Sequence, residues 1–106
     1  MQKPAITEQP IHDLLAARWS GRAYDASKLV TSAQVISMLE AARWAPSCFG
    51  DQPWRYVVCN KAENMQAWQA AFDCLVAANQ SWAVNAPVLL LICTDTLFSH
   101  NQKANK

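Results

Sequence analysis

The sequence contains little glycine, little charge and no long apolar run. Two of its 106 residues are glycine and 16% are charged, with a formal net charge of +1. A net charge so close to zero gives no electrostatic basis for binding nucleic acid or an anionic membrane surface. The longest apolar stretch, residues 86–93, is far too short to span a bilayer.

The sequence also lacks the cysteine spacing of a metal or redox site. Cys48, Cys59, Cys74 and Cys93 stand 11, 15 and 19 residues apart, which matches no zinc or redox motif. Three of them have apolar neighbours, so we expect free thiols that act as small core residues. Free thiols and a polar N-terminus without a signal peptide predict a reducing compartment, the cytoplasm.

The residues that are present indicate a globular chain. Hydrophobic residues make up 52% of the sequence, which is typical of a folded protein. A chain of 106 residues forms at most one domain. It buries roughly two thirds of its unfolded surface, enough for one modest core.

Hydrophobic periodicity and breaker residues predict three helices and two strands. Thr31 and Gln34 form a capping box, and Pro46 ends the helix that they begin. The second strand is apolar at every position, as expected of a strand buried on both faces. The predicted elements are a helix over 11–17, a helix over 32–44, a strand over 54–59, a helix over 62–77, a polar break over 79–85, a strand over 88–93 and an aperiodic polar end over 95–106.

This order of elements predicts a mixed α/β sandwich of the α+β class. Two strands alone make only a marginal sheet. We therefore expect their missing partners to come from another chain or from a second half of the domain, and we expect these residues not to form a self-sufficient monomer.

Two short segments are candidates for a binding site. Residues 45–58, APSCFGDQPWRYVV, contain two prolines between a helix and a strand. Such an irregular link with free backbone N–H groups lines a ligand site or serves as a stiff turn. In residues 18–22, RWSGR, an extended backbone places Arg18, Ser20 and Arg22 on one side, which suits a phosphate. The alternative is that the two arginines pair with Asp13 and Asp25.

The residues of both segments resemble sequence motifs of the nitroreductase family of FMN-dependent oxidoreductases. Residues 18–22 look like that family's Arg-x-Ser-x-Arg motif, and residues 45–58 look like its Pro-Ser and Gln-Pro-Trp-Arg motif. The resemblance implies a three-layer α/β sandwich, FMN bound at the interface of a homodimer, NAD(P)H as donor, and nitroaromatics or quinones as acceptors. It covers the N-terminal half of the family's domain, so residues 1–106 are expected to be a partial, truncated nitroreductase-like domain.

The resemblance also implies which residues hold FMN. Arg18 and Arg22 would grip the phosphate or ribityl end, and the loop would contact the isoalloxazine. The family commonly carries Asn where this chain has Gly50, which leaves only a backbone N–H at that place. No side chain is expected to be catalytic, and no metal is expected. The implied cofactor-binding residues are Arg18, Trp19, Ser20, Arg22, Pro46, Ser47, Cys48, Gly50 and Gln52.

Two other interpretations stay open on the sequence. The chain is a truncated, non-catalytic remnant that binds no flavin, or it is a small interaction module unrelated to flavin. The second of these accounts for the composition but for neither motif.

Overall fold

Helices and two strands make up the regular structure of residues 2–104, the part of the chain that the computed structural model describes. Their mixture and order confirm the predicted α+β class. The elements are α1 (Asp13–Ala17), α2 (Ser32–Ala42), the short 3-10 helix η1 (Cys48–Gly50), β1 (Trp54–Asn60), α3 (Met65–Asp73), α4 (Ala77–Ala83) and β2 (Val88–Thr94).

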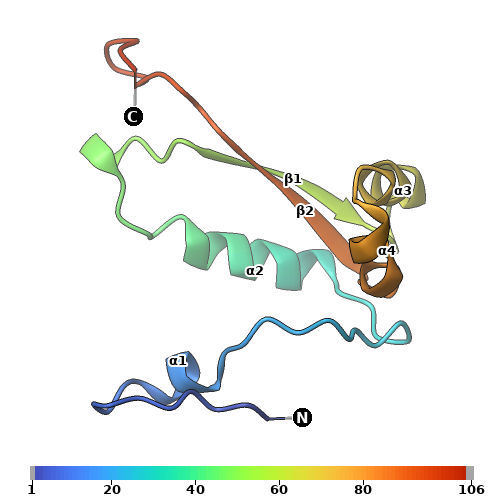
Figure 1. Cartoon of the computed structure of the whole chain (residues 1–106). Helices are drawn as coiled ribbons and strands as arrows, with labels where there is room; N and C mark the ends of the chain where they lie inside the picture. Colours follow the sequence, from blue (N-terminus) through green and yellow to red (C-terminus); the bar gives the residue numbers. More distant parts are fainter. Residues whose placement is uncertain (1, 105–106) are drawn as a thin grey trace.

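The two strands form an antiparallel ribbon with a helix on each face (Figure 1). Both strands pair along their whole length. Successive side chains of a strand point to opposite faces. Val58 of β1 lines a groove with Val35 of α2, whereas Val57 lines a groove with Ala67 of α3. The sheet therefore lies between two helical layers, which confirms the predicted three-layer α/β sandwich.

The most buried large side chain is Trp68 of α3, which is 2% exposed. Its indole Nε1 donates to the carbonyl oxygen of Ala86 at 3.0 Å, just before β2. The Lys61 ammonium lies 3.8 Å from the centre of the indole ring, and the Phe72 ring stacks on it at 5.0 Å. Trp68 thus joins α3 to the turn after β1 and to the start of β2.

α2 begins where the capping box predicts. The Thr31 hydroxyl accepts from the Gln34 N–H at 3.2 Å, and the Gln34 side chain accepts from the Thr31 N–H at 2.9 Å. The helix ends at Ala42, two residues before the predicted end. These reciprocal bonds satisfy two of the N–H groups that a helix start leaves without partners.

The helical region after β1 differs from the prediction. One helix over 62–77 was expected, but α3 begins at Met65 because the Asn64 side chain caps it, accepting from the Ala67 N–H at 3.0 Å. The predicted polar break over 79–85 is wrong, because α4 occupies most of it. Gln80 of α4 donates to the Phe72 carbonyl at 3.2 Å, so its polar side chain stabilises the junction between the two helices.

α1 is shorter than predicted and begins at Asp13. The His12 imidazole Nδ1 accepts from the Leu14 N–H at 3.1 Å and caps the helix. Arg18 is already extended, with φ −70° and ψ 133°. In Figure 1 this N-terminal part lies away from the strands.

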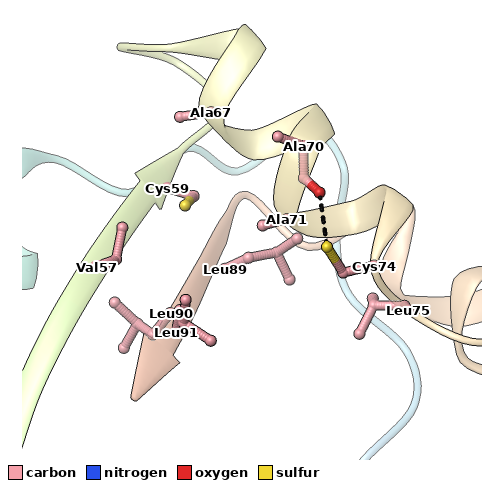
Figure 2. A pocket seen from close by; sticks show the side chains of 10 residues that line it. All are labelled: Val57, Cys59, Ala67, Ala70, Ala71, Cys74, Leu75, Leu89, Leu90 and Leu91. Atoms are coloured by element: carbon pink, nitrogen blue, oxygen red, sulfur yellow. Dashed lines mark hydrogen bonds between the residues drawn. The ribbon is translucent and has the colours of Figure 1, made fainter. Parts of the chain in front are cut away.

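β2 is not buried on both faces, so that prediction is wrong for the chain alone. Val88 and Leu89 are half-buried, but Leu91 and Ile92 are 56% and 64% exposed. α3 covers only the beginning of the strand and leaves an apolar groove of about 480 Å³ over the sheet, lined by Leu89, Leu91, Ala71 and other side chains (Figure 2).

The chain is extended for its size. Its accessible surface is 8565 Å², whereas a compact monomer of 11.8 kDa exposes about 5,900 Å². Its radius of gyration is 17.0 Å, against about 13 Å for a compact chain of this length. The uncovered strand is one part of this excess surface.

All four cysteines are free, as predicted, but their placement in the core is mostly wrong. Only Cys59 is buried, while Cys48, Cys74 and Cys93 are exposed. Cys93 is exposed because it lies in the uncovered part of β2. None of the helices between residues 2 and 104 combines the length and apolar character that a membrane span needs.

Candidate functional site

Residues 18–22 lie between α1 and α2 in no helix or strand: Arg18 is extended and Arg22 is at a bend. The Arg18 guanidinium Nη1 donates to the Ser20 hydroxyl at 3.4 Å, so these two side chains lie on one side of the backbone. Arg18, Ser20 and Arg22 are all exposed. Among residues 2–104, the ion pairs join Arg43 to Glu40 and Arg55 to Asp95. The alternative pairing of the motif arginines with acidic neighbours is therefore absent from this part of the chain.

Asp25 has a partner of its own. Its carboxylate accepts from the Ser27 hydroxyl at 2.5 Å and from the Ser27 N–H at 2.9 Å. These two hydrogen bonds, the hydroxyl's first, lower the pKa of Asp25 below its usual value of 3.8. The Asp25 carboxylate is therefore hydrogen-bonded within the turn that follows residues 18–22.

Aromatic side chains surround the same segment. The Trp19 ring lies so close to Gly21 that a Cβ added there would come within 3.3 Å of it. Tyr24 stacks on Trp82 of α4, with ring centres 5.9 Å apart. Trp19, Ser20, Tyr24 and Trp82 line a hollow of about 740 Å³. Trp82 fell in the predicted polar break, so its link to the motif was missed.

The loop over 46–52 is ordered and strained. The Ser47 hydroxyl accepts from the Gln52 N–H at 3.1 Å and closes the loop. Phe49 and Gln52 have φ values of 55° and 45°, in the left-handed region that side chains other than glycine rarely adopt. Such backbone costs about 1–3 kcal/mol per residue and is concentrated at functional sites. Pro46 and Cys48, in the same loop, are exposed.

Gly50 does not leave its backbone N–H unpaired, as the sequence interpretation expected. That N–H donates to the Ser47 carbonyl at 3.1 Å. Gly50 has a φ of 65°, and an added Cβ would meet no atom within 4 Å. The position therefore has room for a side chain, but its backbone donor is already used within the loop.

Polar residues outside the predicted set hold this loop in place. The Arg55 Nη1 donates to the carbonyls of Gln52 at 3.0 Å and Trp54 at 2.8 Å, and its Nη2 pairs with the Asp95 carboxylate at 2.5 Å. The Asp51 carboxylate accepts from the Ser99 N–H and hydroxyl. These partners come after β2, in the segment that showed no periodicity.

The two candidate segments lie in different parts of the chain. Figure 1 shows the turn after α1 below α2. The loop over 46–52 lies on the other side of α2 in this view, just before the start of β1. Within the described residues, no hydrogen bond or ion pair joins residues 18–22 to residues 46–52. One segment offers two guanidiniums and a hydroxyl, as a phosphate requires. The other offers a hydroxyl, a thiol and an amide on a rigid backbone, as suits a planar ring with a polar edge.

Comparisons with known proteins identify what the chain is similar to. The sequence profile of the nitroreductase family matches residues 15–105. The chain is 32% identical over 75 residues to the major NAD(P)H-flavin oxidoreductase of Aliivibrio fischeri, an alignment that covers 71% of this chain and 34% of that protein. It is 34% identical over 56 residues to a protein named as an NAD(P)H nitroreductase in Staphylococcus saprophyticus, covering 53% of this chain and 26% of that protein.

A solved structure of an oxidoreductase containing FMN has the same fold. It superposes with a TM-score of 0.82 and 34% sequence identity, over 95% of this chain and 50% of that one. The chain thus spans half or less of the length of each of these relatives.

Proposed function

This chain belongs to the nitroreductase family, and from that membership we propose that it forms the N-terminal half of an FMN-dependent oxidoreductase domain that takes electrons from NAD(P)H. The observation that carries the proposal is the pair of motif segments, each with side chains suited to a different end of FMN. FMN supplies the hydride chemistry when it is bound. The chain's own residues bind and orient it.

Arg18, Ser20 and Arg22 hold the FMN phosphate in this proposal. The hydrogen bond from Arg18 to Ser20 already brings two of these groups together. Guanidinium groups donate charge-assisted, bidentate hydrogen bonds that match phosphate oxygens. Since no acidic side chain between residues 2 and 104 pairs with either arginine, binding a phosphate breaks no ion pair. Trp19 lies beside them and borders the adjoining hollow.

The loop over 46–52 lies against the isoalloxazine in this proposal. The Ser47 hydroxyl accepts from the Gln52 N–H, so its own proton stays available to donate. Pro46 and Cys48 present apolar and thiol surface to the ring. The exposed Gln52 side chain reaches the polar edge of the isoalloxazine. The Gly50 N–H does not take this role, because it already donates to the Ser47 carbonyl.

A second copy of the chain completes each site in this proposal, because the two segments lie apart within one chain (Figure 1). The excess surface supports it: an obligate interface buries about 2,000–5,000 Å² in total, or about 1,000–2,500 Å² from each chain, and the 8565 Å² that this chain exposes exceeds the surface of a compact monomer, about 5,900 Å², by roughly 2,700 Å². Sedimentation across a dilution series tests it. We expect a dimer that loses helical circular dichroism as it dissociates, and a stable, folded monomer would contradict the proposal.

The electron acceptor that we propose is a small aromatic molecule, a nitroaromatic or a quinone. Its class follows from the family resemblance. The cytoplasm stays our prediction for the location of the protein, on the cysteine pattern described above.

Titration with FMN tests the proposed function. We expect the purified protein to be yellow, or to quench the fluorescence of added FMN. In Arg22→Ala, the loss of one charged hydrogen bond costs about 1.5–3 kcal/mol, a roughly tenfold to hundredfold weaker affinity. Arg43→Ala is the matched control, since Arg43 is the C-cap of α2, forms an ion pair with Glu40 and lies outside both candidate segments. A colourless protein that does not bind added FMN would instead support the interpretation of the chain as a truncated, non-catalytic remnant.

A further inference from the structure

We propose that Arg55 is a positioning residue for the flavin, because it holds the loop over 46–52 in its binding conformation. This inference rests on the proposed function, in which that loop contacts the isoalloxazine. Arg55 lies outside the proposed set of binding residues. Its ion-pair partner, Asp95, directly follows the end of β2.

The contacts of Arg55 form a closed polar network. Its guanidinium donates to the Gln52 and Trp54 carbonyls and pairs with the Asp95 carboxylate. The Asp95 N–H in turn donates to the Pro53 carbonyl at 2.7 Å. Three successive carbonyls, from residues 52 to 54, are thereby tied to the pair of Arg55 and Asp95. The network crosses from the start of β1 to the residue that follows β2.

An isolated ion pair at this level of exposure contributes little. The side chains of Arg55 and Asp95 are 59% and 47% exposed, and exposed pairs are worth about 0–1 kcal/mol. The network differs from an isolated pair because the planar guanidinium donates to two carbonyls while it pairs with the acid. Its effect is therefore expected on the local shape of the loop and not on the global stability of the fold.

The loop needs such support because its backbone is strained. Gln52, whose carbonyl Arg55 binds, has a φ of 45° and precedes a proline, which disfavours helical backbone. On the other side of the loop, Asp51 accepts from Ser99, and the Phe49 ring packs on Phe98 with centres 5.8 Å apart. Strained residues persist only where surrounding contacts determine their conformation. Gln52 itself is held by two contacts: its N–H donates to the Ser47 hydroxyl, and its carbonyl accepts from Arg55.

Hydrogen exchange and FMN titration of the full chain test the proposal. The variants are Arg55→Gln and Asp95→Asn, singly and together, with Arg43→Gln as the control. The Arg43 pair with Glu40 has similar exposure, 52% and 57%, but binds no loop carbonyl. Arg55→Lys keeps the charge for Asp95 but not the fork for the two carbonyls.

We expect amide exchange at Gly50, Asp51 and Gln52, whose N–H groups are hydrogen-bonded within the loop, to become about tenfold faster in Arg55→Gln, with exchange in both strands and the urea midpoint unchanged. FMN affinity should fall by about tenfold, and the absorption bands of the bound flavin should shift. Asp95→Asn should have a smaller effect in the same direction, the double variant should be less than additive, and Arg55→Lys should restore part of the affinity.

Loop exchange and FMN affinity that match those of Arg43→Gln would overturn the proposal. The two hypotheses fail separately. If the unmodified protein binds no FMN, the proposed function is wrong, and loop exchange alone still decides whether Arg55 holds the loop. If FMN binds and Arg55→Gln leaves exchange and affinity unchanged, the proposed function stands and the role of Arg55 is refuted.

Discussion

Replacing Trp68 by phenylalanine tests the packing between α3 and the sheet. Trp68 is the most buried large side chain, and three different contacts meet on its indole. Phenylalanine fills most of the same space and keeps the stack on Phe72, but it removes the Nε1–H that donates to Ala86. The substitution therefore isolates the polar part of the contact.

The expected cost follows from these contacts. The Ala86 carbonyl lies in a buried residue and loses its indole donor, which costs about 1–3 kcal/mol. A benzene ring attracts the Lys61 ammonium less than an indole does, which adds roughly 0.5 kcal/mol. We expect a total destabilisation of about 1.5–3.5 kcal/mol, which lowers the urea midpoint by roughly 0.7–1.8 M at an m-value of about 2 kcal/mol per M.

The assay is urea unfolding followed by far-ultraviolet circular dichroism at one fixed protein concentration, because association changes apparent stability. Trp44→Phe is the matched control: Trp44 is 75% exposed, its Nε1 donates to Glu40 at 3.4 Å, and Arg43 lies 5.4 Å from its ring. We expect the control to cost less than about 0.5 kcal/mol. Equal midpoint shifts in the two variants would refute the importance of the buried hydrogen bond.

Two further predictions concern loops. Gly50→Asn should leave stability nearly unchanged because asparagine tolerates a positive φ, whereas Gly50→Val should cost about 1–2 kcal/mol, both measured by urea unfolding; equal costs would show that φ relaxes. Because hydrogen bonds lower the pKa of Asp25 in the fold, its contribution to stability is complete above its unfolded pKa and is lost as the pH falls through its folded pKa. Ser27→Ala should raise the pKa of Asp25 toward 3.8 in an NMR titration, and an unchanged pKa would exclude the hydroxyl as its cause.

Elements with local signals were predictable from the sequence. The capping box places the start of α2 correctly because its two hydrogen bonds join residues only three apart. An extended backbone after α1 was expected to place Arg18 and Ser20 on one side, and the structure places these two side chains together. In each case, the residues that determine the structure are neighbours in the sequence.

Elements that depend on distant partners were not predictable in the same way. α4 has a polar composition that reads as a loop, but Gln80 bonds to the end of α3 and Trp82 stacks on Tyr24. Arg55 and Asp95 carry no local sign of their common role, because they are 40 residues apart and meet only when β1 pairs with β2. Sequence patterns therefore predict candidate binding residues more readily than residues that hold a loop in place.

The exposed half of β2 shows a third kind of limit. Its apolar side chains predict cover on both faces, yet α3 covers only the start of the strand and Ile92 is 64% exposed. Leaving apolar surface in water costs about 25 cal/mol per Å² relative to burying it. Covering the exposed half of β2 would therefore stabilise the protein. The prediction of buried faces fails for this chain alone, and a second half of the domain or a second copy of the chain would give the same residues cover. Apolar patterning describes burial in the assembled protein, so the disagreement at Leu91 and Ile92 is itself an argument for a partner surface.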